Sequence, residues 1–141
     1  MPDEGAYSVT LTRIEQLAAW RAARALAVDV HHATGETAFD RDTGLRADLR
    51  AAATSIMTSL AEGCEQKTCA EFDRYLRVAI GSAAELLSLT YLAEDTGLFP
   101  VEAARATRLQ VMDVSRHVER LRRAIVRYRT LPLPADRPRV N

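Results

Sequence analysis

The chain has 141 residues, 48% of them hydrophobic and 27% charged, which is typical of one soluble globular domain. Its 19 basic and 19 acidic side chains cancel, so no overall charge draws the protein to nucleic acid or to an anionic membrane. With only 6% aromatic residues and few β-branched runs, a β-sandwich or barrel is excluded. Pro100 is the only proline between Pro2 and Pro132, which leaves long stretches free to form helices.

Turn residues and apolar residues at helical spacing predict four helices. The first is expected over residues 12–34, and a polar loop over 35–44 separates it from a second helix over 45–62. Gly63 follows directly, where we expect a left-handed residue to end the second helix. The apolar positions of these two helices are Ile14, Leu17, Leu26 and Val30, and then Leu45, Leu49, Ala52, Ile56 and Leu60.

The third helix is expected over residues 69–95. Thr68 and Glu71 form a capping-box pattern at its start, and Gly97 follows its end. Its apolar residues cover nearly the whole circumference, so we expect neighbours on several sides, including another subunit. Its longest run with little charge, sixteen residues between Arg77 and Glu94, is interrupted by Glu85 and is shorter than the about 20 apolar residues of a membrane span, so we expect a buried helix of a soluble protein. The residues expected on its core face are Phe72, Leu76, Ala79, Ala83, Leu86 and Ala93.

Two residues in the middle of this helix stand out. Glu85 is a carboxylate among apolar side chains, so we expect it to be buried and paired, with Arg50, Arg46 or Trp20 as the donor. In that position it would fix the register between helices as a structural core residue. Gly81 costs about 1 kcal/mol relative to alanine in a helix interior, and we expect another backbone to approach closely there.

The fourth helix is expected to begin at Pro100 and to carry an unbroken apolar seam. The seam consists of Ala104, Thr107, Val111, Val114, Val118, Leu121, Ile125 and Tyr128. Short connections between the helices indicate an all-α, antiparallel up-and-down four-helix bundle over residues 12–130. The flanking segments, 1–11 and the proline-rich 131–141, are expected to be poorly ordered.

The neutral total charge hides two unequal parts. Residues 1–99 have a net charge of −6 and residues 100–141 have a net charge of +6. Arginines recur every three or four residues on the side of the fourth helix away from the seam. Because guanidinium groups bind phosphate oxygens regardless of base sequence, we predict a nucleic-acid-binding surface. Its members are Arg105, Arg108, Arg116, Arg120, Arg123 and Arg127. In the alternative interpretation these arginines meet acidic side chains, and the protein is a protein-only scaffold.

Catalytic and metal-binding patterns are not found in the sequence. It has no nucleophile elbow, phosphate loop or Glu-x-x-His pair, so we expect no enzymatic activity, no cofactor and no metal. Arg24 and His31 share a helical face, as in HEPN-type ribonucleases, and this remains the last-ranked alternative. Cys64 and Cys69 are expected to be reduced thiols. The first residues show no secretory signal, so we expect a cytoplasmic protein.

Three runs resemble a known family of four-helix bundle proteins. They are LRAAATSIMTSLAEG (49–63), EFDRYL (71–76) and AIGSAAEL (79–86), and LAAWRAA (17–23) also fits. The family includes proteins encoded in the intervening sequences of bacterial 23S rRNA genes. The likeness extends over about residues 14–128.

This resemblance implies a bundle that assembles into a homo-oligomeric ring, commonly a pentamer, without established enzymatic activity. A distant relative is the accessory protein of diversity-generating retroelements, which contacts the reverse transcriptase and binds nucleic acid through a basic surface. The resemblance therefore implies RNA or DNA, and a reverse transcriptase, as partners. Many relatives carry an arginine in place of Ala51 and an asparagine in place of Ser59, which leaves the arginines of the fourth helix to supply the basic surface here.

Overall fold

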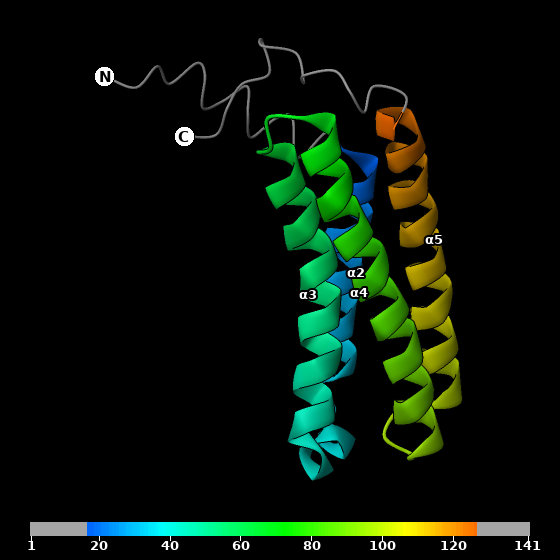
Figure 1. Cartoon of the computed structure of the whole chain (residues 1–141). Helices are drawn as coiled ribbons and strands as arrows, with labels where there is room; N and C mark the ends of the chain where they lie inside the picture. Colours follow the sequence, from blue (N-terminus) through cyan, green and yellow to red (C-terminus); the bar gives the residue numbers. More distant parts are fainter. Residues whose placement is uncertain (1–16, 127–141) are drawn as a thin grey trace.

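A computed structural model describes residues 17–126, which form four α-helices and one short 3-10 helix. Successive α-helices run in opposite directions along the bundle (Figure 1). The segments 1–11 and 131–141, for which we expected poor order, lie outside the described residues, as do Arg127 and Tyr128. The elements are α2 (Ala18–Ala33), η1 (Thr37–Arg41), α3 (Thr43–Cys64), α4 (Cys69–Asp95) and α5 (Val101–Val126).

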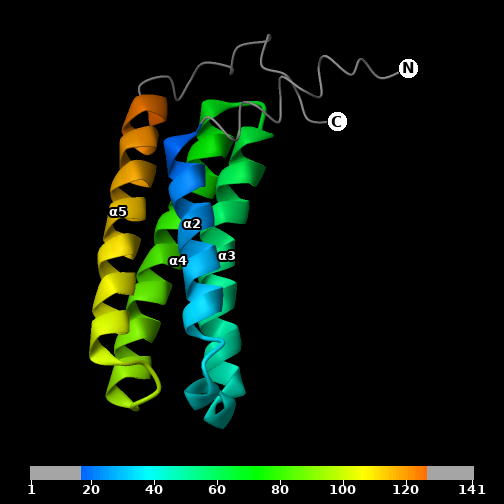
Figure 2. The ribbon, with the colours of Figure 1, turned by 180° about the vertical axis from the view of Figure 1, so that it is seen from behind.

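Each helix packs against two others. α2 and α4 both contact α3 and α5, so the helices follow one another around the bundle in chain order. Seen from behind, α2 lies between α5 and α3 (Figure 2). The predicted antiparallel up-and-down bundle is confirmed for the single chain, and its assembly into a ring stays a prediction.

One face of each helix forms the core. The apolar positions that the periodicity predicted for α3, α4 and α5 are buried, or partly buried in the case of Leu121 and Ile125. Many of the buried side chains are small, which lets the helix axes approach closely. The core residues that line the bundle include Ala19, Ala23, Leu26 and Val30 of α2, Leu49, Ala53, Ile56 and Leu60 of α3, Leu76, Ala79 and Leu86 of α4, and Ala104, Val111, Val114 and Val118 of α5.

The start of α4 is capped as predicted. The Thr68 side chain accepts a hydrogen bond from the Glu71 backbone N–H at 3.1 Å. The Glu71 carboxylate in return accepts the backbone N–H of Lys67, one residue before the expected Thr68, at 3.3 Å. The two bonds satisfy backbone donors that lack partners within the helix.

The turn from α4 to α5 also has the expected geometry. Gly97 has a φ of 74°, and its N–H bonds to the Glu94 carbonyl at 3.0 Å. The next N–H, of Leu98, bonds to the Ala93 carbonyl at 2.9 Å, which completes a Schellman motif. Pro100 lies immediately before α5, where its carbonyl accepts the first bond of the helix.

Phe39 closes one end of the bundle. Residues 35–44 were expected to form a polar loop, but η1 within them places the Phe39 side chain fully inside the core. Its ring packs edge-on against Phe99, with centroids 5.6 Å apart and planes at 81°. Because Phe99 belongs to the connection between α4 and α5, both connections at this end share one apolar contact.

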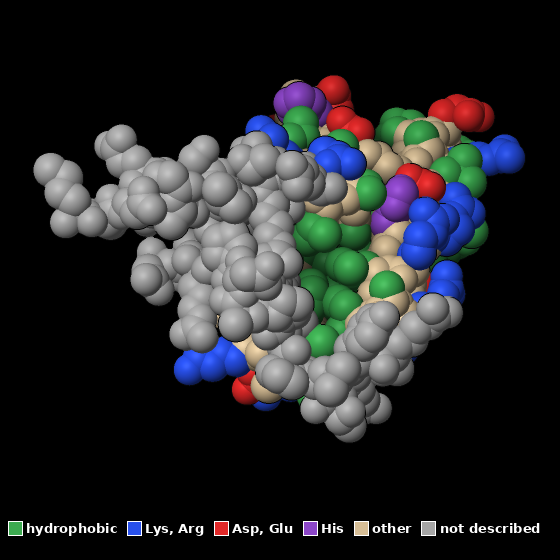
Figure 3. Space-filling view, turned by 90° about the horizontal axis from the view of Figure 1, so that it is seen from above, with side chains coloured by type: hydrophobic (Ala, Val, Ile, Leu, Met, Phe, Trp, Pro, Cys, Tyr) green, Lys and Arg blue, Asp and Glu red, His purple; other side chains and the backbone are tan. Residues whose placement is uncertain are grey.

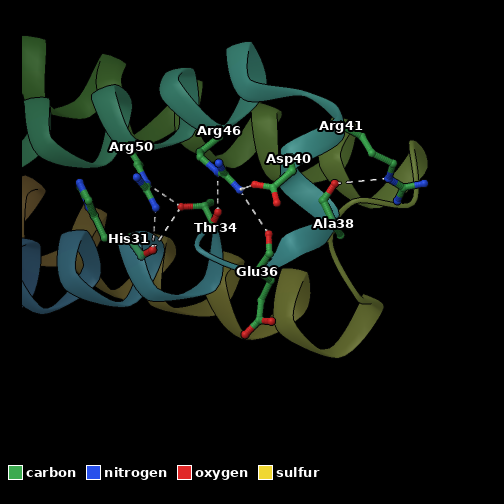
Figure 4. Close-up of polar contacts among 8 residues, drawn as sticks. All are labelled: His31, Thr34, Glu36, Ala38, Asp40, Arg41, Arg46 and Arg50. Atoms are coloured by element: carbon green, nitrogen blue, oxygen red, sulfur yellow. Dashed lines mark hydrogen bonds and ion pairs between the residues drawn. The ribbon is translucent and has the colours of Figure 1, made fainter.

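Two arginines of α3 hold the C-terminal end of α2 (Figure 4). Arg46 Nε donates to the Thr34 carbonyl at 2.8 Å, and its Nη2 lies 2.7 Å from Asp40 Oδ1. Arg50 Nε donates to Thr34 Oγ1 at 2.8 Å, and its Nη2 donates to the His31 carbonyl at 3.1 Å. The guanidinium groups thereby satisfy carbonyls at a helix C-terminus, where the helix dipole favours positive charge.

The prediction for Glu85 is wrong within the chain. Its side chain is exposed on α4, and Arg50 bonds to the end of α2 instead. The buried carboxylate of α4 is Asp73, which is 1% exposed. Asp73 Oδ1 accepts a hydrogen bond from Arg122 Nε of α5 at 2.8 Å, and its Oδ2 lies 3.6 Å from Arg77 Nε. A buried charge in α4 is paired, as it must be, but it joins α4 to α5.

Gly63 and Gly81 have roles opposite to those predicted. Gly63 lies inside α3, not in a left-handed conformation after its end. A Cβ on Gly63 would lie 2.6 Å from Cδ2 of Phe72, so the glycine lets α3 pack closely on α4. Gly81 is exposed, and a Cβ there would meet no atom within 4 Å. The close approach expected at Gly81 is therefore not made by the described part of this chain.

Among the described residues, α4 alone is long and apolar enough to cross a membrane by length and composition. Its buried face belongs to the core of the bundle, and that face includes the ion-paired Asp73. A helix that contributes one face to a bundle core is expected to be rich in apolar residues. We therefore interpret α4 as a core helix, as the sequence predicted.

Replacing Gly63 by alanine should lower the free energy of unfolding by about 1–3 kcal/mol, because the added methyl group overlaps the Phe72 ring. The matched Gly81→Ala variant should raise it by about 0.5–1 kcal/mol, because alanine is the better helix former and nothing obstructs it. Urea unfolding at low protein concentration measures both changes. A destabilised Gly81→Ala variant would contradict the open environment of this residue in the single chain.

The two arginines beside Asp73 should contribute unequally to stability. Arg122→Ala should lower the free energy of unfolding by about 3 kcal/mol, because it leaves a buried carboxylate without its close partner. Arg77→Ala is the matched control. It should lower the free energy of unfolding by less than about 1 kcal/mol, because Arg77 lies farther from the Asp73 carboxylate and its side chain is more than half exposed. Equal losses in urea unfolding would show that the Asp73–Arg122 contact is not the stronger one.

Candidate nucleic-acid interface

The packing of α5 decides which of its arginines reach solvent. Arg108 and Arg122 lie about four turns apart on one flank of the helix, and both turn toward α4. The opposite flank faces α2, where Gln110 Nε2 donates to Asp29 Oδ2 at 3.0 Å. The remaining arginines lie on the outer side, away from the buried seam.

Arg108 is held against α4 and does not lie on the outer surface. Its Nη1 lies 2.6 Å from Glu94 Oε2, and its guanidinium carbon lies 4.1 Å from the centroid of the Tyr91 ring. Only 14% of its side chain is exposed. The placement of Arg108 in the predicted surface is therefore corrected: it joins α5 to α4, as Arg122 does through Asp73.

Four members of the predicted arginine surface are exposed on α5. Arg116 has a partner on its own helix, because its Nη2 lies 3.3 Å from Asp113 Oδ1, but both side chains are more than half exposed and the pair is weak. Within residues 17–126, the other three have no carboxylate at ion-pair distance. We call the exposed set, Arg105, Arg116, Arg120 and Arg123, the outer arginines.

Three of the outer arginines form a continuous row near the C-terminal end of α5. Arg116, Arg120 and Arg123 follow one another at about one helical turn, or about 4.5–6 Å along the axis. Viewed from this end of the bundle, basic side chains gather at the edge of the molecule where α5 lies (Figure 3). The row can follow a line of negative charges along the helix.

Apolar side chains divide the outer side of α5. Leu109 is 58% exposed and Met112 is 49% exposed, and both lie between Arg105 and Arg116. Tyr91 and Leu92 of α4 are also about half exposed on the neighbouring helix. We call Tyr91, Leu109 and Met112 the α4/α5 apolar patch. The exposure of Leu109 and Met112 could have been predicted from the sequence, because both residues share the helical face of the arginines.

A second surface lies between α2 and α3. Arg24 and His31, which the sequence placed on one helical face, line the same open pocket of about 730 Å³. Trp20 lines it too, and the Arg24 guanidinium carbon lies 5.6 Å from the centroid of the indole ring. From the sequence we did not predict that Trp20 lines a pocket with Arg24. The spacing of four residues between them, which places both on one helical face, was the available signal.

The described residues form neither a metal-ligand cluster nor a disulfide. Among residues 17–126, no group of three or more His, Cys, Asp or Glu side chains could hold a metal ion. Cys69 is buried and Cys64 partly buried, and neither is in a disulfide. The two cysteines therefore remain thiols at the connection between α3 and α4.

The fold is similar to that of a solved protein. A crystal structure of a protein of unknown function from the S23 ribosomal protein family of Bacteroides thetaiotaomicron superposes with a TM-score of 0.68. The match covers 74% of this chain and 98% of that one at 14% sequence identity, so the likeness concerns the fold alone. No curated protein matches the sequence.

The sequence also matches a family model over most of its length. The model describes the 23S rRNA-intervening sequence protein family, and it matches residues 15–120. This range includes the three runs that carried the resemblance, and it extends from the start of α2 into α5. The resemblance seen in the sequence is therefore confirmed, and the chain belongs to the 23S rRNA-intervening sequence protein family.

Proposed function

We propose that the protein is a non-catalytic, homo-oligomeric helical bundle that binds the phosphate backbone of RNA or DNA through the outer arginines. The observation that carries the proposal is the row of exposed guanidinium groups on α5. Arg120 and Arg123 have no carboxylate at ion-pair distance among the described residues, and the one beside Arg116 is solvated. Their charges are therefore available to an external anion.

The chemistry of this surface favours the nucleic-acid backbone over the bases. The row lies on a long helix of a rigid bundle, so its guanidinium groups keep a regular spacing. Arginine side chains bind phosphate oxygens in a forked geometry and need no particular base sequence. No aromatic side chain interrupts Arg116, Arg120 and Arg123, so base stacking does not contribute there. We expect binding that depends on charge and little on sequence.

RNA is the polyanion that the family suggests. The family takes its name from the intervening sequences of 23S rRNA. A role as an accessory factor in an RNA-linked or retroelement process, with a reverse transcriptase as protein partner, follows from the resemblance and stays a prediction. A cytoplasmic location suits such a role and stays a prediction as well.

A second copy of the chain is the proposed occupant of the α4/α5 apolar patch. Tyr91 and Met112 lie on either side of Arg108, so the patch extends across both helices. Burying half-exposed leucine, methionine and tyrosine side chains would stabilise association by about 1 kcal/mol or more each. The row Arg116, Arg120 and Arg123 lies beyond the patch toward the other end of α5. One surface can therefore hold subunits together while the other binds nucleic acid.

The protein-only scaffold remains the second candidate, and one observation favours it. Asp48, Glu62 and Glu85 are exposed on α3 and α4, on the opposite side of the bundle from α5. If the basic side of one subunit met this acidic side of the next, repeated contacts would close a ring. In that assembly the outer arginines would be neutralised by protein and would bind no nucleic acid.

Salt dependence distinguishes the two candidates. Binding to mixed-sequence RNA should weaken steeply as salt rises, because phosphate contacts release counterions. Changing Arg120 or Arg123 to glutamine should each reduce the slope of log K against log salt by about 1. Arg41→Gln is the matched control, because Arg41 is also exposed but lies at the other end of the bundle. Fluorescence anisotropy of labelled RNA measures all four proteins, and no binding at low salt would refute the proposal.

The apolar patch is tested through the mass of the protein in solution. Leu109→Glu should convert the oligomer into monomer, because it places a charge in the proposed contact. Ala51→Glu on the exposed side of α3 is the control, and it should leave the mass unchanged. Light scattering after gel filtration measures both variants. A monomeric wild-type protein would contradict the assembly and leave the RNA titration as a separate question.

A further inference from the structure

The pocket between α2 and α3 is an open groove that combines apolar and basic lining residues. Its volume of about 730 Å³ falls within the range of small-molecule sites, about 300–1,000 Å³. Trp20 and Val28 of α2 form part of its lining, and Met57 of α3 forms another part. Val28 is 47% exposed, so the pocket presents apolar surface that the described chain leaves uncovered.

Arg24 brings a positive charge to this apolar surface. Its guanidinium group lies over the Trp20 ring, with 5.6 Å between the guanidinium carbon and the ring centroid. This cation–π contact leaves N–H donors of the guanidinium group available to a ligand. No carboxylate in the described part of the chain lies at ion-pair distance from Arg24. The group is therefore positioned by the indole without being neutralised.

One contact orients the His31 ring, and a second holds the His31 backbone. Its Nδ1 lies 2.8 Å from the Ala27 carbonyl, and because a carbonyl only accepts, Nδ1 carries the hydrogen. Arg50 holds the His31 backbone by donating to its carbonyl at 3.1 Å (Figure 4). Nε2 is then left for a ligand: it accepts a hydrogen bond in the neutral ring and donates one in the protonated ring.

The lining of the pocket selects an anion with a flat apolar part. Arg24, His31 and His32 are its ionisable residues, and none of its lining residues is acidic. An inorganic anion would leave the indole and Met57 surface unused, and a neutral apolar molecule would leave Arg24 without a partner. A nucleotide supplies both parts, since its phosphate suits the guanidinium edge and its base packs on an aromatic side chain.

We propose that the pocket lined by Trp20, Arg24 and His31 binds one nucleotide unit, with its phosphate on Arg24 and its base against Trp20 and Met57. The unit is a free nucleoside monophosphate or an unpaired residue of a single-stranded RNA. The sugar can donate to the Thr54 hydroxyl oxygen, whose own hydrogen goes to the Arg50 carbonyl, and it can bond to His31 Nε2. This site is separate from the outer arginines, and it does not depend on their binding nucleic acid.

The chain contains a reporter for this site, because Trp20 is its single tryptophan. Titration of the full chain with uridine monophosphate should quench the Trp20 fluorescence to saturation. Uridine should bind about tenfold more weakly, because it lacks the charge-assisted contact with Arg24. Inorganic phosphate should leave the fluorescence unchanged. A short oligouridylate that quenches at much lower concentration than the monophosphate, while an RNA duplex does not, would identify unpaired RNA as the source of the unit.

Arg24→Gln should weaken binding of the monophosphate by about tenfold without unfolding the bundle, because the side chain is exposed. Arg41→Gln in η1 is the matched control and should leave the quenching unchanged, because Arg41 is exposed and does not line the pocket. Lack of quenching by both uridine monophosphate and oligouridylate, or equal quenching in Arg24→Gln and the wild type, would overturn the proposal. Salt-sensitive binding of mixed-sequence RNA through the outer arginines would still stand in that case, so the two proposals fail separately.

Discussion

The burial of one face of α5 is the constraint on which the surface of this protein depends. Ala104, Val111 and Val118 must face the core, and the helical period then assigns every other residue of α5 to a side. Arg108 and Arg122 fall on the flank toward α4, where Glu94 and Asp73 neutralise them. The arginines that fall on the outer side keep their charge in solvent. Packing of apolar residues thus decides which cations are structural and which are available for binding.

Separate contacts close one end of the bundle and hold α2 in place. Phe39 and Phe99 join the two connections at that end, which lie about 60 residues apart in sequence. Arg46 and Arg50 of α3 bond to the last carbonyls of α2, the shortest of the four helices in the described chain. Because α2 is held in this way, the Trp20 and Arg24 side chains keep a defined place beside α3.

Glu85 and Gly63 show why some residues could not be assigned from the sequence. The argument that a carboxylate in α4 must be paired was correct, but it applied to Asp73. Glu85 lies in the most apolar part of α4, whereas Asp73 has Glu71, Arg74 and Arg77 near it in the sequence. The local pattern therefore pointed to Glu85 as the buried carboxylate, and the periodicity of a helix that is apolar nearly all round does not tell which side faces α5. Gly63 has the position of a helix terminator in the sequence, and only the Phe72 ring packed against it reveals its role in a helix interior.

The sequence by itself determined that four α-helices follow one another in an antiparallel bundle, because helical spacing and turn residues are local properties of the chain. It also identified the family and the arginines of α5. Only the tertiary structure decided that Arg108 is paired, that Leu109 and Met112 divide the outer side, and that Trp20, Arg24 and His31 share a pocket with Met57. These features depend on which helices are neighbours and on their rotation about their own axes. Contacts between distant segments set both quantities, and no local pattern records them.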